Sequence, residues 1–207
     1  MKSRLLCILH FPPPVHGSSM VGEFVRKSDI INNKFNTRYI NLGTSKSVDD
    51  IGKRPISKLF KYFKIVWQVV IQMISFRPDK VYIALTVKGT AFYKDAFLAI
   101  LAKMLGGDLI YHLHNKGVQD RNDRYFDNWL YKRVFNNAEV ILLSELLYPD
   151  IEKYVPRERV YICPNGIPEQ INITNNEAGK SDNKPVQLLF LSNLIQSKGV
   201  YMLLEAC

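Results

Sequence analysis

Residues 5–19 read LLCILHFPPPVHGSS, and this stretch sets the pattern from which the fold is predicted. It opens with five consecutive apolar residues, 5–9, a run with the length and character of a strand that is buried on both faces. A loop that holds His10, three prolines and Gly17 follows, and a helix is expected from 18 to about 31. A buried strand that leads through a short loop into a helix is typical of an α/β fold.

Apolar runs of strand length recur along the chain with helical segments between them, and they cover 5–9, 39–42, 81–85, 109–113, 140–143 and 160–162. Most of these runs are continuous rather than alternating, which predicts strands with both faces buried. Strands of that kind, separated by crossovers, form a parallel sheet with helices on both sides. The sequence therefore predicts an α/β fold, a Rossmann-like parallel sheet sandwiched by helices.

Further helices are expected between the strands, at about 57–75, 91–105, 124–135 and 145–154. In the helix from 18 to 31, Ser18 or Ser19 could cap the N-terminus, and Glu23 would favour the first turn. In the helix from 145 to 154, Pro149 is expected in the first turn, where a proline is tolerated.

The chain of 207 residues exceeds a common single domain of roughly 100 to 150 residues and falls short of two. Residues 1–164 are predicted to form an N-terminal Rossmann-like domain, and the Asn-, Gly- and Pro-rich residues 165–184 a linker. Residues 185–207 are predicted to begin a second Rossmann-like domain, with a buried strand at 186–191 and a helix from 200. The chain is therefore expected to end inside a truncated second domain.

The net charge of +9 is concentrated near the N-terminus. Residues 1–70 carry twelve Lys and Arg against four Asp and Glu, a net +8, whereas the remainder carries sixteen against fifteen, a net +1. Such a patch suits an anionic membrane surface, a phosphate-bearing substrate or nucleic acid, or it is a solvated face that keeps the protein soluble. No basic-aromatic RNA motif or recognition-helix pattern is present, so nucleic acid is not expected as a partner.

Lys58, Lys61 and Lys64 repeat every three residues among apolar neighbours. A basic helix of this kind could lie on anionic lipid, or it could pack its apolar side on the sheet with the lysines in water. The apolar segment 65–76 is well below the ~20 residues that span a bilayer, so no transmembrane helix is predicted.

The three cysteines, Cys7, Cys163 and Cys207, form no CxxC pair and are interpreted as reduced thiols. The N-terminal residues mimic a signal peptide, but the apolar stretch is short and is cut by His10 and three prolines, so a buried first strand is favoured. The expected location is cytoplasmic, with peripheral contact at the inner face of the membrane.

The loop 10–19 is the first candidate for a binding site, because ligands of a doubly wound sheet bind at the carboxyl ends of its strands. The helix that follows has free N–H groups and a positive dipole end that could hold an anion, and Gly17 has no side chain to block it. The loop contains neither GxGxxG nor GxxxxGKS. A tight turn without a ligand is the alternative.

A second candidate is His112-Leu113-His114, where alternation points both imidazoles to the same side of a strand. No convincing third ligand accompanies them, so no metal site is predicted. Each histidine is either a polarising group facing a cleft or a satisfied structural residue. A third candidate is the turn 192–199, where Lys198 suits a pyrophosphate or is an ordinary surface lysine.

In their order and spacing, these loops resemble those of the retaining nucleotide-sugar glycosyltransferases of the GT-B fold, of the family 4-like, group 1 type. In that family two Rossmann-like domains face each other across a cleft. The resemblance spans nearly the whole chain and is fairly specific in combination. It rests on Pro-Pro-x-x-Gly at 13–17, on His114, on PNGIP at 164–168, and on LFLSNL at 189–194 leading to KGV at 198–200.

The resemblance implies a function for each matching residue. Gly17 would let the donor pyrophosphate approach, and Lys198 would neutralise the leaving diphosphate. His114 would be the catalytic residue, reaching the transferred sugar or the developing oxocarbenium charge. Donor contacts are expected from Gly17, Ser18, Asn193, Lys198 and Gly199, and acceptor or membrane contacts from His16, Lys58, Lys61 and Lys64. The enzyme would transfer a sugar with retention to a glycan or lipid-linked acceptor in surface polysaccharide assembly, without a metal or cofactor.

Two features depart from the family pattern. Asn193 stands where many relatives have Arg, and an amide supplies no charge to phosphate. The Glu-x7-Glu segment that grips the donor in this family is expected beyond residue 207, so the chain as given is expected to bind donors poorly and to be inactive. Two alternatives stay open: a sugar-nucleotide epimerase of the same fold, and a non-catalytic basic module that binds a membrane or a partner.

Overall fold

The computed structural model describes residues 2–43, 56–166, 188–191 and 199–206. The chain divides into two compact units, Met1–Ile167 and Pro168–Cys207. The division falls inside the segment 165–184, for which the sequence predicts a linker.

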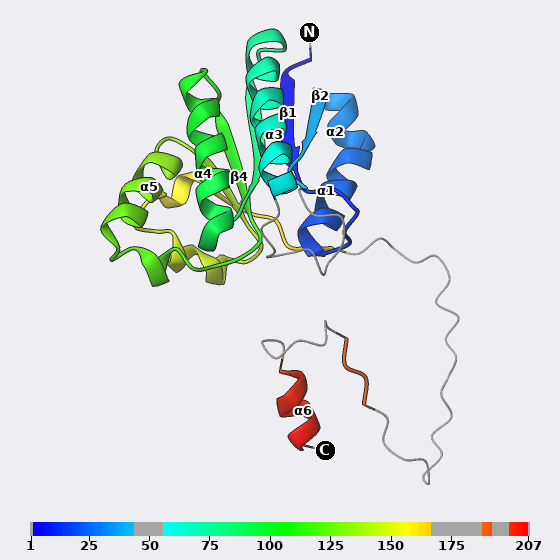
Figure 1. Cartoon of the computed structure of the whole chain (residues 1–207), viewed down its shortest axis with the longest axis vertical. Helices are drawn as coiled ribbons and strands as arrows, with labels where there is room; N and C mark the ends of the chain where they lie inside the picture. The colour runs from blue at the N-terminus through cyan, green and yellow to red at the C-terminus, as the bar shows by residue number, and fades with distance from the viewer. Residues whose placement is uncertain (1, 44–55, 167–187, 192–198, 207) are drawn as a thin grey trace, which may run out of the picture. The chain divides into compact units, whose positions relative to one another are not determined.

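The first unit is built on six parallel strands in the order β2-β1-β3-β4-β5-β6. The strands are β1 (Arg4–Leu9), β2 (Asn36–Asn41), β3 (Lys80–Leu85), β4 (Leu109–Leu113), β5 (Glu139–Leu142) and β6 (Val160–Ile162). The predicted α/β fold with a Rossmann-like parallel sheet is confirmed, and helices flank the sheet (Figure 1). The prediction of strands with both faces buried is wrong for β2 and β6, because they form the edges of the sheet.

The helices of the first unit are α1 (Gly17–Lys27), α2 (Asp29–Lys34), α3 (Ile56–Ser75), α4 (Gly89–Met104) and α5 (Tyr125–Phe135), with short 3-10 helices η2 (Gln119–Arg121), η3 (Glu145–Asp150) and η4 (Arg157–Arg159). The helices predicted at 57–75, 91–105 and 124–135 are confirmed within two residues as α3, α4 and α5. Each connects two parallel strands of the sheet, with α3 leading from β2 to β3, α4 from β3 to β4 and α5 from β4 to β5.

The single helix predicted from 18 to 31 is in fact two, because Ser28 adopts an extended backbone that ends α1 and caps α2. The predicted cap was also wrong. His16 caps α1, its Nδ1 accepting from the Ser19 N–H at 3.3 Å while the Ser19 hydroxyl accepts from the His16 N–H at 2.9 Å. Glu23 lies beyond the first turn and pairs with Arg26 and Lys27 instead.

The prediction of an α-helix from 145 to 154 is also wrong, because the structure has the 3-10 helix η3 followed by turns. Pro149 is the fifth residue of this segment and not part of its first turn. A proline there has no N–H to donate to the carbonyl four residues earlier, and its ring clashes with that carbonyl, so an α-helix cannot continue.

One face of the sheet is covered by α3, α4 and α5, which lie side by side across it (Figure 1). Alternate strand residues point into this layer, among them Leu6, Ile83 and Tyr111, which are fully buried. They form one continuous apolar cluster with the inner sides of the three helices. We call this face of the sheet the packed face.

The other face holds a smaller apolar cluster, which consists of Leu5, Cys7, Leu9, Phe11 and Ala84. Val25 of α1 and Ile31 of α2 pack against it, together with Phe35. Farther along the same face, Ile110 and Ile141 are only partly buried. We call this the thin face, because the described helices cover it only near β1 and β2.

The second unit contains α6 (Val200–Ala206) among its described residues, preceded by Gly199 at a φ of +80°. The buried strand predicted at 186–191 is not formed at 188–191, where Leu188, Leu189 and Leu191 are exposed. A strand needs a hydrogen-bonded neighbour, and the described part of this unit offers no second strand. Among the helices that the structure describes, none has the length and apolar content to cross a bilayer.

Candidate functional site

The four histidines of the chain lie at the carboxyl edge of the sheet, on the segments that end or follow β1 and β4. His10 follows β1 directly, His16 begins α1, His112 lies near the end of β4 and His114 follows it. The chain leaves β1 toward β2 and leaves β3 toward β4, so the direction of winding reverses between β1 and β3. That reversal is where an α/β sheet opens a crevice for a ligand.

The histidines lie close enough to one another to interact. The ring centroids of His10 and His16 are 5.6 Å apart, and those of His112 and His114 are 4.2 Å apart. Burial is the main reason that the pKa of His10 is lowered to about 4, and nearby charge on His16, His114 and Lys94 lowers it further. The loops after β1 and β4 therefore contribute to one cluster.

The pKa values of the other three histidines are also below their usual range. Burial lowers the pKa of His112 to about 4, with a smaller contribution from His114, and burial lowers the pKa values of His16 and His114. At neutral pH the cluster is therefore a group of neutral imidazoles. Each neutral ring carries one N–H donor and one nitrogen acceptor, so it can orient hydroxyl groups of a ligand.

His112 has a defined partner on one ring nitrogen and none on the other. Its Nδ1 lies 2.6 Å from the hydroxyl of Tyr82 on the neighbouring strand β3. Its Nε2 is buried and has no hydrogen-bond partner among the residues that the structure describes. A buried ring nitrogen without a partner costs about 1 to 3 kcal/mol. This atom is thus a position where a bound molecule or a water would be stabilised.

The start of α1 is shaped to leave space above Gly17. A Cβ atom placed on Gly17 meets no other atom within 4 Å, and the residue is exposed. The His16 cap takes up the N–H of Ser19, so the N–H groups of Gly17 and Ser18 belong to the helix end that an anion would approach. The Ser18 hydroxyl lies 3.1 Å from His16 Nδ1, which joins it to the histidine cluster.

Three side chains that the sequence reasoning missed hold the loops of this edge in place. Asn41, at the end of β2, accepts hydrogen bonds from the backbone N–H groups of Phe11 at 3.2 Å and Gly43 at 2.8 Å. Asp95 of α4 accepts from the N–H of Thr86 at 3.0 Å, directly after β3. Asp95 is buried, and burial raises its pKa to about 6.

The third side chain is Asp150, at the end of η3, which holds the loop after β4. Its carboxylate accepts from three consecutive backbone N–H groups, of Gly117 at 2.9 Å, Val118 at 3.1 Å and Gln119 at 3.0 Å. The donors and the acceptor are more than 30 residues apart in the chain. Only the tendency of aspartate to accept backbone N–H groups at turns could have hinted at such an anchor.

Gly22 is a further residue that the sequence reasoning missed. A Cβ atom at this position would lie 2.1 Å from the carbonyl oxygen of His10, so only glycine lets α1 approach the end of β1 this closely. The distance between His10 and His16 depends on this close approach, because both residues lie between β1 and Gly22.

The sequence-predicted site residues fall into three groups. His16, Gly17, Ser18 and His114 come together at the carboxyl edge. The three lysines Lys58, Lys61 and Lys64 lie on α3 instead. Asn193 and Lys198 lie outside the described residues, and Gly199 belongs to the second unit, so their predicted convergence with Gly17 stays a prediction.

A metal site is not apparent in the part of the chain that the structure describes, where no three His, Cys, Asp or Glu side chains are grouped to hold one ion. The paired imidazoles of His112 and His114 are an arrangement of two. A zinc ion bound by protein side chains takes three or four ligands.

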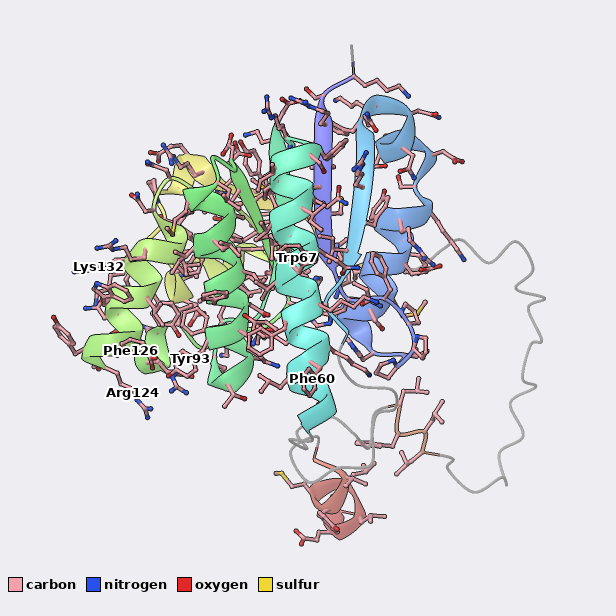
Figure 2. The ribbon with its side chains drawn as sticks, turned by 45° about the horizontal axis from the view of Figure 1, so that its top comes forward. Phe60, Trp67, Tyr93, Arg124, Phe126 and Lys132 are labelled. Atoms are coloured by element: carbon pink, nitrogen blue, oxygen red, sulfur yellow. The ribbon has the colours of Figure 1, made fainter. Side chains whose placement is uncertain are left out.

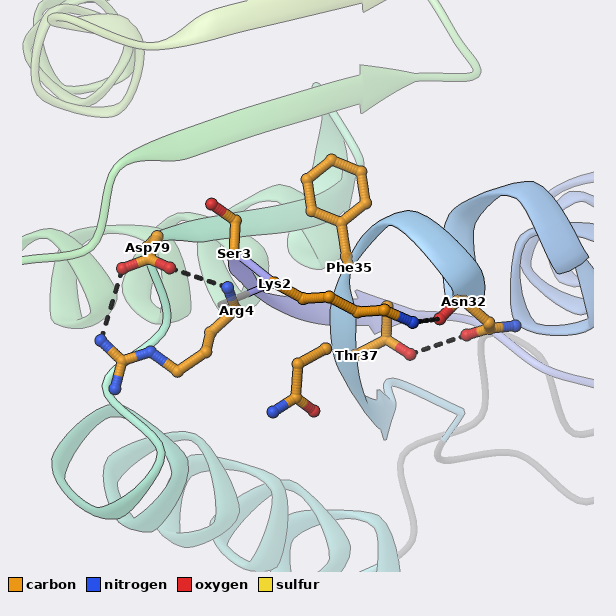
Figure 3. Close-up of a pocket in the computed structure, with 8 residues that line it drawn as sticks. Lys2, Ser3, Arg4, Asn32, Phe35, Thr37 and Asp79 are labelled. Carbon is orange, nitrogen blue, oxygen red and sulfur yellow. Dashed lines mark hydrogen bonds and ion pairs between the residues drawn. The ribbon is translucent and has the colours of Figure 1, made fainter.

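A depression at the opposite, amino edge of the sheet is a weaker candidate (Figure 3). Its charged residues Arg4 and Asp79 satisfy each other, because the Asp79 carboxylate accepts from the Arg4 backbone N–H at 2.7 Å and from its guanidinium at 3.4 Å. Lys2 donates to the carbonyl of Asn32 at 3.4 Å. These contacts tie β1 to its surroundings, and the depression lies away from the carboxyl edge where ligands of this fold bind.

The fold and the site together define a Rossmann-like α/β unit with a histidine cluster at the carboxyl edge of its sheet. Comparison of the chain with protein-family models, with curated proteins and with solved structures finds no match in any of the three. The functional interpretation therefore depends on the geometry of the chain itself.

Proposed function

We propose that the chain is the acceptor-side part of a retaining glycosyltransferase that uses a nucleotide-sugar donor. The observation that supports this proposal best is the convergence of four neutral histidines and the open start of α1 at the reversal point of a parallel sheet. A nucleotide-sugar has two parts that match this edge, a diphosphate and a polyhydroxylated ring.

The diphosphate would lie at the start of α1. The helix has eleven residues, and its aligned peptide dipoles place partial positive charge at Gly17 and Ser18. The space above Gly17 lets an anion approach the backbone directly. Stabilising the charge that develops on a leaving diphosphate is the main demand of glycosyl transfer from such a donor.

The sugar would lie against His114. A neutral imidazole donates or accepts one hydrogen bond per nitrogen, which suits sugar hydroxyl groups, and the lowered pKa keeps it neutral at physiological pH. His16, on the other side of the cluster, would face the acceptor. The unpartnered Nε2 of His112 adds a third position for a hydroxyl or a bound water.

Binding is tested by nuclear magnetic resonance on the uniformly 15N-labelled chain, titrated with nucleoside diphosphates and nucleotide-sugars. This method detects weak binding. The signals of His16 and His114 are expected to shift together with those of Gly17 and Ser18. The variant Gly17→Val should keep the fold, because its Cβ meets no atom, yet should abolish the shifts. The matched control Val15→Ser changes an exposed neighbour and should leave them intact.

The reaction is tested by incubating the longest natural protein that contains this chain with a radiolabelled nucleotide-sugar and a membrane-lipid or glycan extract. Transfer of label to the acceptor with an unchanged anomeric configuration, lost in His114→Ala, would support the proposal. Epimerised nucleotide-sugar formed without an acceptor would replace the proposal by the epimerase alternative. No shift of any histidine signal with any donor would reject both.

A further inference from the structure

Helix α3 carries two apolar stripes on opposite sides. The inner stripe packs on the sheet and includes Ile65, Val69 and Met73, all buried. The outer stripe repeats at spacings of three and four residues along one side of the helix, and it consists of Phe60, Phe63, Trp67, Ile71 and Ile74. All five are exposed, from 41% for Ile71 to 72% for Phe60. Packing on the sheet therefore uses only one of the two apolar sides.

The outer apolar side continues across α4 and α5. Tyr93 and Phe97 of α4 are exposed, as are Phe126 and Trp129 of α5. The ring of Tyr93 lies 6.0 Å from that of Phe126, which in turn stacks 6.0 Å from Trp129. Figure 2 shows Phe60 and Trp67 on α3, Tyr93 on α4 and Phe126 on α5 on the side of the molecule that faces the viewer. We call the exposed outer sides of α3, α4 and α5 the aromatic surface.

The charges of these helices have one sign where they reach solvent. Helices α3, α4 and α5 contain seven Lys and Arg residues and two acidic residues, Asp95 and Asp127. Both acids are buried. Asp127 accepts hydrogen bonds from Arg121 at 2.8 Å and from the hydroxyl of Tyr93 at 2.7 Å, so its negative charge is compensated within the protein. The exposed charges, for example Lys64 and Lys132, are all positive.

We propose that the aromatic surface docks the protein on the face of an anionic lipid bilayer. Trp, Tyr and Phe side chains have an apolar body that enters the boundary between headgroups and acyl chains. Lysines and arginines beside them meet anionic headgroups, and each contributes about 1 kcal/mol near such a surface. Arg133, whose guanidinium lies 5.2 Å from the ring of Trp129, shows this pairing of cation and aromatic ring within the surface. The charge complementarity favours lipid over a second copy of the chain, whose own surface would repel it.

Docking in this way would bring the histidine cluster close to the membrane. A crossover helix runs opposite to the strands, so the first turns of α3, α4 and α5 lie at the carboxyl edge of the sheet. Phe60, Tyr93 and Phe126 belong to the first two turns of their helices. The membrane inference does not depend on the proposed transfer reaction, because it requires neither donor nor acceptor.

The two tryptophans of the chain, Trp67 and Trp129, both lie on the aromatic surface, so intrinsic fluorescence reports on it directly. The protein is mixed with phosphatidylcholine vesicles that contain about one third phosphatidylglycerol, or with pure phosphatidylcholine. We expect a blue shift of emission and quenching by brominated acyl chains with the anionic vesicles only. Raising the ionic strength to about 1 M, where the Debye length is about 3 Å, should weaken the binding.

Variants separate the cationic from the aromatic contribution. Lys64→Glu with Lys132→Glu should lower vesicle affinity by about 25-fold or more, since loss of each cation corresponds to about five-fold. Phe60→Ser should lower it by about ten-fold, from lost burial of a phenyl ring. Because these side chains are exposed, the circular dichroism spectrum should not change. The matched control Lys34→Glu on α2, an exposed residue away from this surface, should lower affinity by less than two-fold.

Four results would overturn the inference. The first is an unchanged tryptophan spectrum with anionic vesicles at low salt. The second is an equal loss of affinity in Lys34→Glu and in Lys64→Glu, which would mean that net charge alone matters. The third is binding to an acidic polymer such as RNA in preference to vesicles. The fourth is a concentration-dependent dimer, seen by sedimentation, that the Phe60→Ser change dissociates. Loss of vesicle binding with histidine shifts retained would reject docking and leave the proposed transferase intact.

Discussion

The packed face of the sheet and the thin face differ in what covers them and in what their side chains do. Beneath α3, α4 and α5, a continuous apolar cluster joins β1, β3, β4 and β5. Beneath α1 and α2, a much smaller cluster surrounds Cys7 and Phe11, and the same face carries Tyr82 hydrogen-bonded to His112. Since strand side chains alternate between faces, His112 points away from the main core.

The two faces therefore contribute differently: the packed face mainly to stability, and the thin face to the polar groups of the candidate site. The packed face removes the most apolar area from water, so it is expected to supply most of the folding free energy. The thin face tolerates polar groups because its cover is incomplete, and it is there that a ring nitrogen without a partner persists. Groups that are costly to bury are often found at functional sites.

Truncating one phenylalanine on each face gives the largest expected effect. Phe135 is buried against Tyr111, Tyr131 and Tyr154 on the packed face, so Phe135→Ala should lower the free energy of unfolding by about 3 to 5 kcal/mol. Phe11→Ala on the thin face should cost about 1 to 2 kcal/mol less, because neighbours can relax into the space. Urea unfolding measures both, and equal losses would show that the two faces are packed alike.

The next effect concerns the two glycines of α1. Gly22→Ala places a Cβ 2.1 Å from the His10 carbonyl oxygen, so α1 must move away from β1 at a cost of about 1 to 3 kcal/mol. The histidine signals of His10 and His16 should shift as the helix moves. Gly17→Ala, in the same helix, meets no atom and should change stability by less than about 1 kcal/mol. A Gly22→Ala protein with wild-type stability and spectra would contradict this packing.

A third prediction uses pH, because the thin face carries histidines that resist protonation. The pKa values of His10 and His112 are about 4 in the folded chain, mainly because both are buried, against about 6.5 when unfolded. Between these values the unfolded chain binds more protons, so this contribution to stability is full above pH 6.5 and is lost as the pH falls toward 4. Each histidine adds a slope of up to about 1.4 kcal/mol per pH unit.

The variant His112→Gln isolates one of these contributions. Tyr82 and His114 face His112, and only His114 adds charge as the pH falls. Asp95 acts in the opposite direction, because its pKa is raised to about 6 and its contribution is lost as the pH rises from 3.8. Asp95 makes the same contribution to stability in both proteins, so it cancels when the free energies of unfolding of wild type and variant are subtracted. Chemical unfolding at pH 4.5, 5.5 and 7.5 should show a shallower pH dependence in the variant, and parallel curves would rule this interpretation out.

The smallest effect comes from removing one hydroxyl on each face. Tyr131 donates to the carbonyl of Val87 at 2.6 Å on the packed face, and Tyr131→Phe should cost about 0.5 to 1.5 kcal/mol without moving the histidine signals. Tyr82→Phe should cost a similar amount but should move the His112 signals and its titration, because the hydroxyl contacts Nδ1. If both variants shift His112, or neither does, then Tyr82 does not fix that imidazole.

The fold was accessible to sequence reasoning wherever a local pattern carried it. Continuous apolar runs located the inner strands, since a strand buried on most of both faces leaves little choice of residue, and the runs at 39–42 and 160–162 overlap the edge strands β2 and β6. Predictions from local sequence chemistry were wrong where two rules applied to the same segment. Ser18 and Ser19 are good N-caps in general, but in the structure His16 accepts the hydrogen bond from the Ser19 N–H and is the cap. Pro149 prevents an α-helix in a segment whose other residues favour one.

The site was accessible only in part. His16, Gly17, Ser18 and His114 were found because they follow strands, and strand ends share one edge in a parallel sheet. Asn41 and Asp150 were missed because each holds the backbone of a segment that is 30 or more residues away in the chain, as Asp150 holds Gly117. Asp95 was missed although Thr86, whose backbone it holds, lies only nine residues before it. No periodicity or spacing encodes such a pair.

The sequence by itself determined the parallel α/β architecture, the positions of the strands and the edge at which polar loops gather, because these follow from local hydrophobic patterns. Tertiary structure decided which face is packed and which is thin, that α3 keeps a second apolar side exposed, and that buried imidazoles stay neutral. Burial and electrostatic environment depend on neighbours that only the folded chain brings together.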